Sequence, residues 1–286
     1  MLHNYTNKEE LVKFLQNKAI DVRKKIVQLV VTAGGGHIGG GLSMTEILLV
    51  LYYDILNIDP KNPQKPDRDR FILSKGHGGV GICPVLADCG YYPESLMCDF
   101  NQYMSPFGMH PDMRKVPGID MSTGSLGHGL PVSVGLCIGA RLQKQTWRTY
   151  CLMGDGECNE GTVWEAAMSA AHYKLGNLTA IIDRNRLMID GPVSEIMEVE
   201  PFEDKWKAFG WDTRVIDGHD VGALLDTFRG LPPADSKKPV CVICNTKKGR
   251  GLSFAENVTK WHYGGLDEEM EKVALADLEK MRAECK

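Results

Sequence analysis

The stretch from residue 149 to residue 183 constrains the fold more than any other part of the chain. It begins with an apolar run at 150–153, passes through the turn Gly154-Asp-Gly156, continues as an alanine-rich helical pattern and ends in a second apolar run at 178–183. A strand, a helix and a second strand of these lengths form a right-handed crossover between parallel strands. The chain is therefore predicted to contain a parallel sheet covered by helices.

The same alternation recurs along the chain. Three more apolar runs have the length and residue types of strands, at 71–74, 213–216 and 240–244. Helical patterns accompany them, at 80–90, 221–229 and 267–284. The predicted fold class is α/β, a doubly wound, mostly parallel sheet flanked by helices, with its ligand at the carboxyl ends of the strands. Because no repeat or linker divides the chain, residues 1–286 are expected to form a single domain.

Three helix starts are predicted from capping boxes, in which Ser or Thr precedes a glutamate by three positions. These boxes are Thr6 with Glu9, Ser43 with Glu46, and Thr162 with Glu165. The first is expected to open a helix that runs to Val31, and the second a helix through Tyr53 that follows the glycine cluster at 34–41. That cluster contains the pattern G-x-G-x-x-G, but no strand precedes it, so a dinucleotide site is disfavoured.

Composition narrows the possible functions. With 33 basic and 37 acidic residues, the net charge of −4 supplies no basic field for nucleic acid or an anionic membrane. No apolar run reaches the roughly 18 residues of a membrane helix and the start is polar, so a cytoplasmic protein is expected. Most of the nine cysteines are expected to be reduced thiols, including Cys241 and Cys244, which should point to opposite faces of one strand.

Polar residues follow the two strands of the first unit where each strand ends. Asp155 lies in the turn after the first strand, and Asn185 directly follows the second. Adjacent parallel strands bring these turns to the same edge of the sheet. A carboxylate, an amide oxygen and a backbone carbonyl suit Mg²⁺, which would share its other positions with phosphate oxygens and water. Taken alone, each residue is better explained as a helix cap or a turn residue, so only the combination indicates a metal.

This combination resembles the thiamine diphosphate motif, in which Gly154-Asp-Gly156 is followed, across a helix and a strand, by Asn185. Further segments resemble those of transketolases in the same order, at 36–39, 69–78, 122–129, 161–191 and 211–220. The resemblance extends from about residue 10 to residue 265. It implies the diphosphate-binding domain of a transketolase, with thiamine diphosphate and Mg²⁺ as cofactors.

The resemblance also implies roles for individual residues. Mg²⁺ would be held by Asp155, Asn185 and the main-chain carbonyl of Leu187. Residues that would contact the cofactor are His77, Gly124, Ser125, Leu126, Gly154, Asp155, Gly156, Glu157, Asn185 and His262. Residues that would act in catalysis are His37, His77, His110 and His262 in the active-site channel, and Glu160 at a subunit interface. For each histidine taken alone, a structural role is about as easily argued.

Two departures from the family pattern limit this transfer of roles. His128 stands where the family usually has a glutamine, and no role is assigned to it. Arg186 stands where a small residue is usual, and it is expected to narrow or charge the cleft. The remaining histidines, at 3, 172 and 219, are interpreted as structural or surface groups.

The resemblance covers only the first of the three domains of full-length transketolases. The pyrimidine-binding and C-terminal domains, with the glutamate that activates the cofactor, are expected on a separate chain. The protein is thus interpreted as the N-terminal subunit of a split transketolase, in a dimer of heterodimers, that transfers a two-carbon ketol unit from a ketose phosphate to an aldose phosphate. Alternatives are a transketolase for an apiose-derived or sulfonated sugar, another thiamine enzyme such as deoxyxylulose-phosphate synthase or a keto-acid dehydrogenase, an inactive binding module, and a nicotinamide dehydrogenase.

Overall fold

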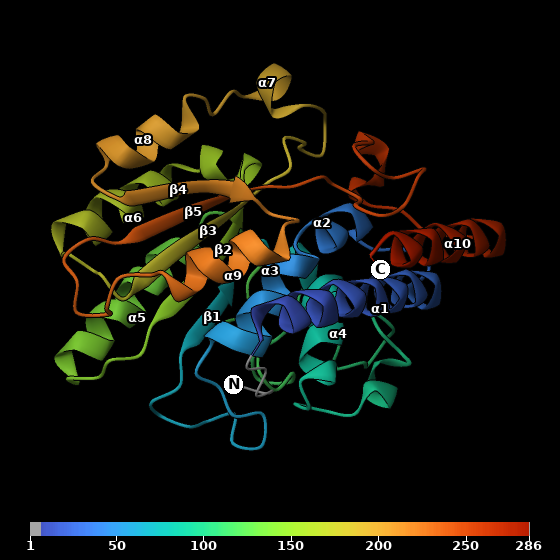
Figure 1. The fold of residues 1–286 in the computed structure, drawn as a ribbon, viewed down its shortest axis with the longest axis horizontal. Coiled ribbons are helices and arrows are strands. Elements are labelled where there is room, and N and C mark those ends of the chain that lie inside the picture. The colour runs from blue at the N-terminus through green and yellow to red at the C-terminus, as the bar shows by residue number, and fades with distance from the viewer. Residues whose placement is uncertain (1–6, 286) are drawn as a thin grey trace.

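A five-stranded parallel sheet forms the centre of the computed structural model, which describes residues 7–285 (Figure 1). The strands are β1 (Arg70–Leu73), β2 (Thr149–Gly154), β3 (Leu178–Arg184), β4 (Asp212–Asp217) and β5 (Val240–Asn245). Their order is β1-β2-β3-β5-β4, and every neighbouring pair is parallel. The predicted α/β class and the positions of all five strands are confirmed.

Helices cover both faces of the sheet. One side carries α1 (Lys8–Ala33), α2 (Ile38–Ser43), α3 (Thr45–Val50), α4 (Gly79–Asp88), α9 (Val221–Arg229) and α10 (Glu268–Glu284). The other side carries α5 (Gly129–Leu142), α6 (Gly161–His172) and α8 (Phe202–Ala208), and the short α7 (Val193–Ile196) lies near the end of β3 (Figure 1). Among residues 7–285, no helix combines the length and hydrophobicity needed to cross a membrane.

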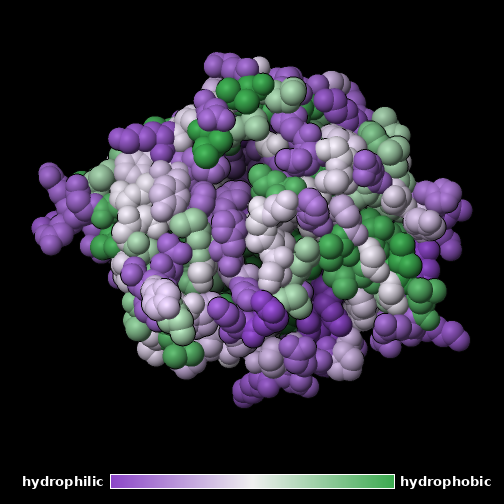
Figure 2. Space-filling view, turned by 180° about the vertical axis from the view of Figure 1, so that it is seen from behind, coloured by the Kyte–Doolittle hydropathy of each residue, from purple (hydrophilic) through white to green (hydrophobic). Residues whose placement is uncertain are grey.

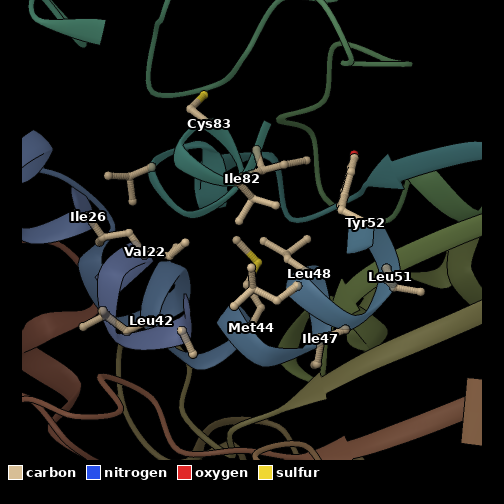
Figure 3. Close-up of a cluster of buried hydrophobic side chains, with 14 of the residues drawn as sticks. Val22, Ile26, Leu42, Met44, Ile47, Leu48, Leu51, Tyr52, Ile82 and Cys83 are labelled. Atoms are coloured by element: carbon tan, nitrogen blue, oxygen red, sulfur yellow. The ribbon is translucent and has the colours of Figure 1, made fainter. Parts of the chain in front are cut away.

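The alternation of side chains along the strands builds two separate cores. In β5, Val242 and Cys244 pack into the core beneath α1, whereas Cys241 packs into the core beneath α5 and α6. The prediction that Cys241 and Cys244 face opposite ways is thus confirmed, and all nine cysteines are free thiols. Figure 3 shows part of the larger core, where Ile26 of α1, Leu48 of α3 and other apolar side chains point toward one another.

Two of the predicted capping boxes are wrong, and the third involves Thr6, which lies outside the described residues. Ser43 is the last residue of α2, and its hydroxyl donates to Asp183 Oδ2 at 2.6 Å instead of capping a helix. The hydroxyl of Thr162 donates to the carbonyl oxygen of Gly127 at 3.1 Å. In both cases a partner distant in sequence takes the hydroxyl that a local cap would use. The described cap of α1 is Asn7, which accepts from the backbone N–H of Glu9 at 2.8 Å.

Candidate active site at the carboxyl ends of the strands

A cavity of about 410 Å³ lies where β1, β2, β3 and β5 end. It is lined by every residue predicted for the site except Ser125: His37, His77, His110, Gly124, Leu126, Gly154, Asp155, Gly156, Glu157, Glu160, Asn185, Leu187 and His262. Ser125 is exposed and does not line the cavity. The fold therefore brings together segments that are widely separated in sequence, at the edge where an α/β sheet binds its ligand.

The turns after β2 and β3 are joined through Asp155. Its Oδ1 accepts from the backbone N–H of Gly156 at 2.9 Å, and its Oδ2 accepts from the backbone N–H of Arg186 at 2.6 Å. Asn185 Oδ1 accepts from the backbone N–H of Leu187 at 3.2 Å. Burial raises the pKa of Asp155 to about 6, although both backbone N–H groups oppose that shift. A cation bound nearby would stabilise the charged form of this buried carboxylate.

The oxygens of Asp155, Asn185 and Leu187 fit a hard cation that completes its coordination elsewhere. Within the described part of the chain, no group of three or more His, Cys, Asp or Glu side chains is placed to hold a metal. The Leu187 carbonyl accepts from Lys248 Nζ at 2.9 Å. Mg²⁺ at this point would thus need further oxygens from a ligand such as a diphosphate, which agrees with the donor set that Mg²⁺ prefers.

Four histidines gather in the same cavity, with His37 at their centre. Its ring centroid lies 4.9 Å from that of His77, 5.3 Å from that of His262 and 6.3 Å from that of His110. Burial and nearby positive charge lower the pKa of His37 to about 4, of His262 to about 3 and of His77 to about 2. These imidazoles are therefore neutral near pH 7 and can each donate and accept one hydrogen bond. The buried Nδ1 of His37 has no hydrogen-bond partner among residues 7–285, so it is available to a ligand.

Two buried lysines that the sequence analysis did not single out also line this cavity. Lys75 Nζ donates to the carbonyl oxygen of Gly40 at 2.9 Å and to Asp183 Oδ2 at 2.5 Å. Lys248 Nζ donates to His262 Nδ1 at 2.8 Å, and burial lowers the pKa of Lys248 to about 8. Both ammonium groups can donate charge-assisted hydrogen bonds to an anionic ligand in the cavity. A charged residue placed two positions after a buried strand, as Lys75 is after Leu73 of β1, was the available signal in the sequence.

Glu157 is fixed by the protein itself. Its Oε1 accepts from the backbone N–H of Gly127 at 2.9 Å and from the Ser74 hydroxyl, and its Oε2 accepts from the backbone N–H of Gly154 at 3.1 Å. Burial raises the pKa of this carboxyl. Glu157 therefore ties the 124–127 loop to the ends of β1 and β2.

Two other predicted features lie at the margin of the cavity. Glu160 is exposed on its rim, at the N-terminus of α6. Arg186 is also exposed, and it lines a neighbouring cavity of about 250 Å³ together with Arg184 and Asp155. Arg186 was expected to narrow or charge the cleft. It does not narrow the main cavity, because it lines the neighbouring cavity instead, and its backbone takes the left-handed conformation (φ 64°).

Comparisons with known proteins give matches over nearly the whole chain. Residues 15–278 match the family model described as transketolase, thiamine diphosphate binding domain. The chain is 43% identical to the 6-deoxy-6-sulfo-D-fructose transketolase subunit SqwG of a Clostridium species, over 93% of this chain and 96% of that protein. It is 42% identical to one of the subunits of the apulose-4-phosphate transketolase of Phocaeicola vulgatus, over 88% of this chain and 89% of that protein.

Solved structures give the same result for the fold. The transketolase of Campylobacter jejuni superimposes with a TM-score of 0.84 and 28% identity, covering 97% of this chain and 46% of that one. A transketolase mutant from Pichia stipitis gives a TM-score of 0.84 with 26% identity, covering 95% of this chain and 44% of the other. The chain thus spans about half the length of these transketolases.

Proposed function

Because the chain belongs to the transketolase family, we propose that it is the N-terminal subunit of a split transketolase. The observation that carries this proposal is the cavity itself, where the Asp155 and Asn185 turns face buried lysines and neutral histidines. Two relatives of nearly the same length are named as transketolase subunits. The proposed reaction moves a two-carbon ketol unit from a ketose phosphate to an aldose phosphate.

The substrate pair is open to one specific alternative. The two relatives are named for 6-deoxy-6-sulfo-D-fructose and for apulose 4-phosphate, so a sulfonated or apiose-derived sugar is the second candidate. Turnover with these sugars and with xylulose phosphate distinguishes the candidates. Consumption of pyruvate instead would indicate deoxyxylulose-phosphate synthase or keto-acid dehydrogenase chemistry. The proposed location is the cytoplasm, where nine free thiols stay reduced.

Thiamine diphosphate and Mg²⁺ are the proposed cofactors. The bound cofactor supplies a carbon nucleophile and an electron sink, so the protein binds, orients and controls protons. Asp155, Asn185 and the Leu187 carbonyl would hold Mg²⁺, and Lys75 and Lys248 would add positive charge beside the diphosphate. We keep the cofactor contacts implied by the family resemblance for the residues that line the cavity. Ser125 is exposed, and its side chain would need to turn inward to contact the cofactor.

The histidines are proposed to handle substrate protons. A neutral imidazole can accept a proton from a sugar hydroxyl and return it later, because its two nitrogens carry one donor and one acceptor. His110 reaches the cavity from a loop and His262 from the end of the 3-10 helix Thr259–His262, and His37 lies beside both rings. Burial and the surrounding cations keep His37 and His262 uncharged near pH 7, and burial also lowers the pKa of His110, which suits a general base.

The proposed partner is a chain that carries a pyrimidine-binding domain, with a dimer of heterodimers as the assembly. Two observations support a docking surface around α5 and α6. Glu160 is exposed on the cavity rim, and Val132, Leu142 and Met168 are 37%, 79% and 54% exposed on these helices. Figure 2 shows hydrophobic side chains gathered on the side of the rear face where α5 and α6 lie. Exposed apolar patches of this kind are typical of protein interfaces.

Trp164 also lies in this region, but its side chain is engaged within the chain itself. Its indole N–H donates to the carbonyl oxygen of Cys158 at 2.8 Å, and its ring packs 5.3 Å from Trp206 and 5.2 Å from Phe209. The ring is thus engaged by α8 and the turn after it. The proposed partner surface keeps Glu160 and the exposed apolar residues, and leaves Trp164 out.

The test is to purify this chain alone and assay transketolase turnover with thiamine diphosphate and Mg²⁺, before and after titration with a pyrimidine-binding subunit. Activity is expected only with the partner. The variant Gly135→Leu places a bulky group on α5 where a Cβ meets no atom within 4 Å, so it should weaken association without disturbing this chain. Lys272→Leu on α10 is the matched surface control. Full turnover by the isolated chain contradicts the split-enzyme proposal.

A further inference from the structure

Asp183, the penultimate residue of β3, joins four segments of the site. It is completely buried, and side chains that lie far apart in sequence donate to it. Ser43 Oγ lies 2.6 Å and Lys75 Nζ 2.5 Å from its Oδ2, and the Thr246 hydroxyl donates to its Oδ1. Asn185 Nδ2 also donates to Oδ2, at 3.3 Å. The ends of α2, β1, β3 and β5 therefore meet at one carboxylate.

The contact with Asn185 fixes which end of the amide faces the cavity. The Asn185 NH₂ group donates to Asp183, and its oxygen accepts from the backbone N–H of Leu187 at 3.2 Å. A flipped amide would place its oxygen against a carboxylate and its NH₂ against another N–H, and both contacts are repulsive. Asp183 thus helps to keep the amide oxygen on the side of Leu187, where the proposed Mg²⁺ would bind.

The contact with Lys75 places a cation in the cavity wall. The Lys75 side chain is 3% exposed, and its other described partner is the carbonyl oxygen of Gly40. A buried ammonium is stable only when a charge or several dipoles compensate it. Asp183 supplies that compensation and holds the ammonium beside Gly40, in the segment that carries His37.

From these contacts we propose that Asp183 is a positioning residue for the metal and diphosphate site: it orients the Asn185 amide and anchors Lys75 before a ligand arrives. This inference rests on the proposed function only in that the proposed function identifies the ligand as Mg²⁺ with thiamine diphosphate. Asp183 does not line the cavity, so it acts through Asn185 and Lys75 and not by direct contact.

The first test compares Asp183→Asn with the wild-type chain, assembled with its partner where binding requires it. The measured quantity is the Mg²⁺ concentration that half-saturates thiamine diphosphate binding in calorimetry. It should rise at least about 10-fold in Asp183→Asn, because asparagine is uncharged and has one acceptor oxygen in place of two, so it compensates Lys75 and holds the Asn185 amide less firmly. The matched control is Asp69→Asn, a buried carboxylate before β1 that should change this value less than about threefold.

A second variant covers the case in which Asp183→Asn unfolds. The double variant Asp183→Asn with Lys75→Met removes the unpaired ammonium and should recover folding. Cofactor binding should stay at least about 10-fold weaker than in the wild type and weaker than in Lys75→Met alone, because the double variant lacks the ammonium and also the charged acceptor of the Asn185 amide. Binding within threefold of the wild type, in either folded variant, overturns the proposal.

Hydrogen exchange on the cofactor-free chain separates this inference from the proposed function. In Asp183→Asn, amide exchange should accelerate together around residues 38–43, 75–78, 185–188 and 246–248, whereas Thr246→Val should affect only the last of these. Unchanged exchange in all four segments overturns the positioning role whatever the ligand is. If the wild type binds no thiamine diphosphate, the proposed function fails while this result still decides the role of Asp183.

Discussion

The two ends of the sheet both bury carboxylates but satisfy them differently. At the amino ends of the strands, Asp69 accepts from the backbone N–H groups of Asn57 at 2.9 Å and Arg148 at 2.7 Å. At the carboxyl ends, Asp183 accepts from side chains of several segments, and Asp155 faces a cavity that also holds buried lysines. Asp69 thus joins two backbone segments at the amino ends of the strands. Asp183 and Asp155, by contrast, hold charged side chains in place around the cavity at the carboxyl ends.

Cavity volume does not distinguish the two ends. The amino end has a cavity of about 470 Å³, slightly larger than the one of about 410 Å³ at the carboxyl end. In the former, Asp54 pairs with Arg229 across two contacts of 2.7 Å. Buried polar atoms without a described partner occur at both ends, at Arg148 Nη1 and at His37 Nδ1. The buried lysines and the cluster of histidine rings therefore distinguish the carboxyl end better than cavity volume or unpaired atoms do.

The largest expected difference between the two ends concerns turnover. His110→Ala and His262→Ala should lower kcat/KM for ketose and aldose by about 100-fold or more, because each removes a group proposed for proton transfer. Cofactor affinity, measured by calorimetry, should change only a few-fold. A variant that loses thiamine diphosphate but has normal kinetics at saturating cofactor would show that its histidine binds cofactor instead.

The next effect concerns cofactor affinity. Asp155→Ala removes the one carboxylate proposed to ligate Mg²⁺, so affinity for thiamine diphosphate with Mg²⁺ should fall at least about 10-fold, or about 1.4 kcal/mol. Asp69→Asn should destabilise folding by about 1–3 kcal/mol and leave affinity unchanged. Calorimetry and thermal unfolding on both variants check this. Equal affinity in Asp155→Ala and the wild type would remove Asp155 from the metal site.

Local patterns predicted the sheet well and the helices less completely. Central parallel strands are buried on both faces, so each appears as an uninterrupted apolar run. Helix α5 was not predicted, because Pro131, Gly135 and Gly139 interrupt its helical pattern. Pro131 is tolerated because it lies in the first turn, where backbone N–H groups lack helical partners anyway. Hydroxyl groups such as that of Ser43 suggested caps but take distant partners.

The candidate site was predicted as a set of residues but not as a network. Family resemblance identified the lining residues, including Asp155 and His37. It did not identify Lys75, Lys248 or Asp183, since their importance comes from partners that lie far away in sequence. Such contacts appear only when strands from different parts of the chain end at one edge.

A smaller effect concerns how the free energy of unfolding depends on pH. Because burial lowers the pKa of His77 to about 2 in the folded chain, the unfolded chain binds protons more readily below pH 6.5. The contribution of His77 to the free energy of unfolding is therefore present at pH 7 and lost as the pH falls. Between pH 7 and pH 5 this loss is on the order of 1 kcal/mol.

The variant His77→Gln checks this sign, because glutamine does not titrate. The free energy of unfolding of the cofactor-free variant, measured by denaturant titration, should depend less steeply on pH than that of the wild type. His172→Gln, at an exposed position at the end of α6, is the control for the substitution itself. A slope in His77→Gln as steep as in the wild type would mean that His77 titrates alike in both states.

The smallest effect belongs to the amino end. Arg229, the last residue of α9, is 42% exposed in its side chain and pairs with Asp54, which is 8% exposed. Partly exposed ion pairs contribute little, so Arg229→Ala should lower the free energy of unfolding by less than about 1 kcal/mol. Thiamine diphosphate affinity should stay unchanged, because no described contact of this pair reaches the carboxyl end. Denaturant titration and calorimetry on the one variant measure both quantities. A loss of affinity beyond threefold would show that the two ends of the sheet are coupled, and that the paired charges at the amino end also help to shape the cavity.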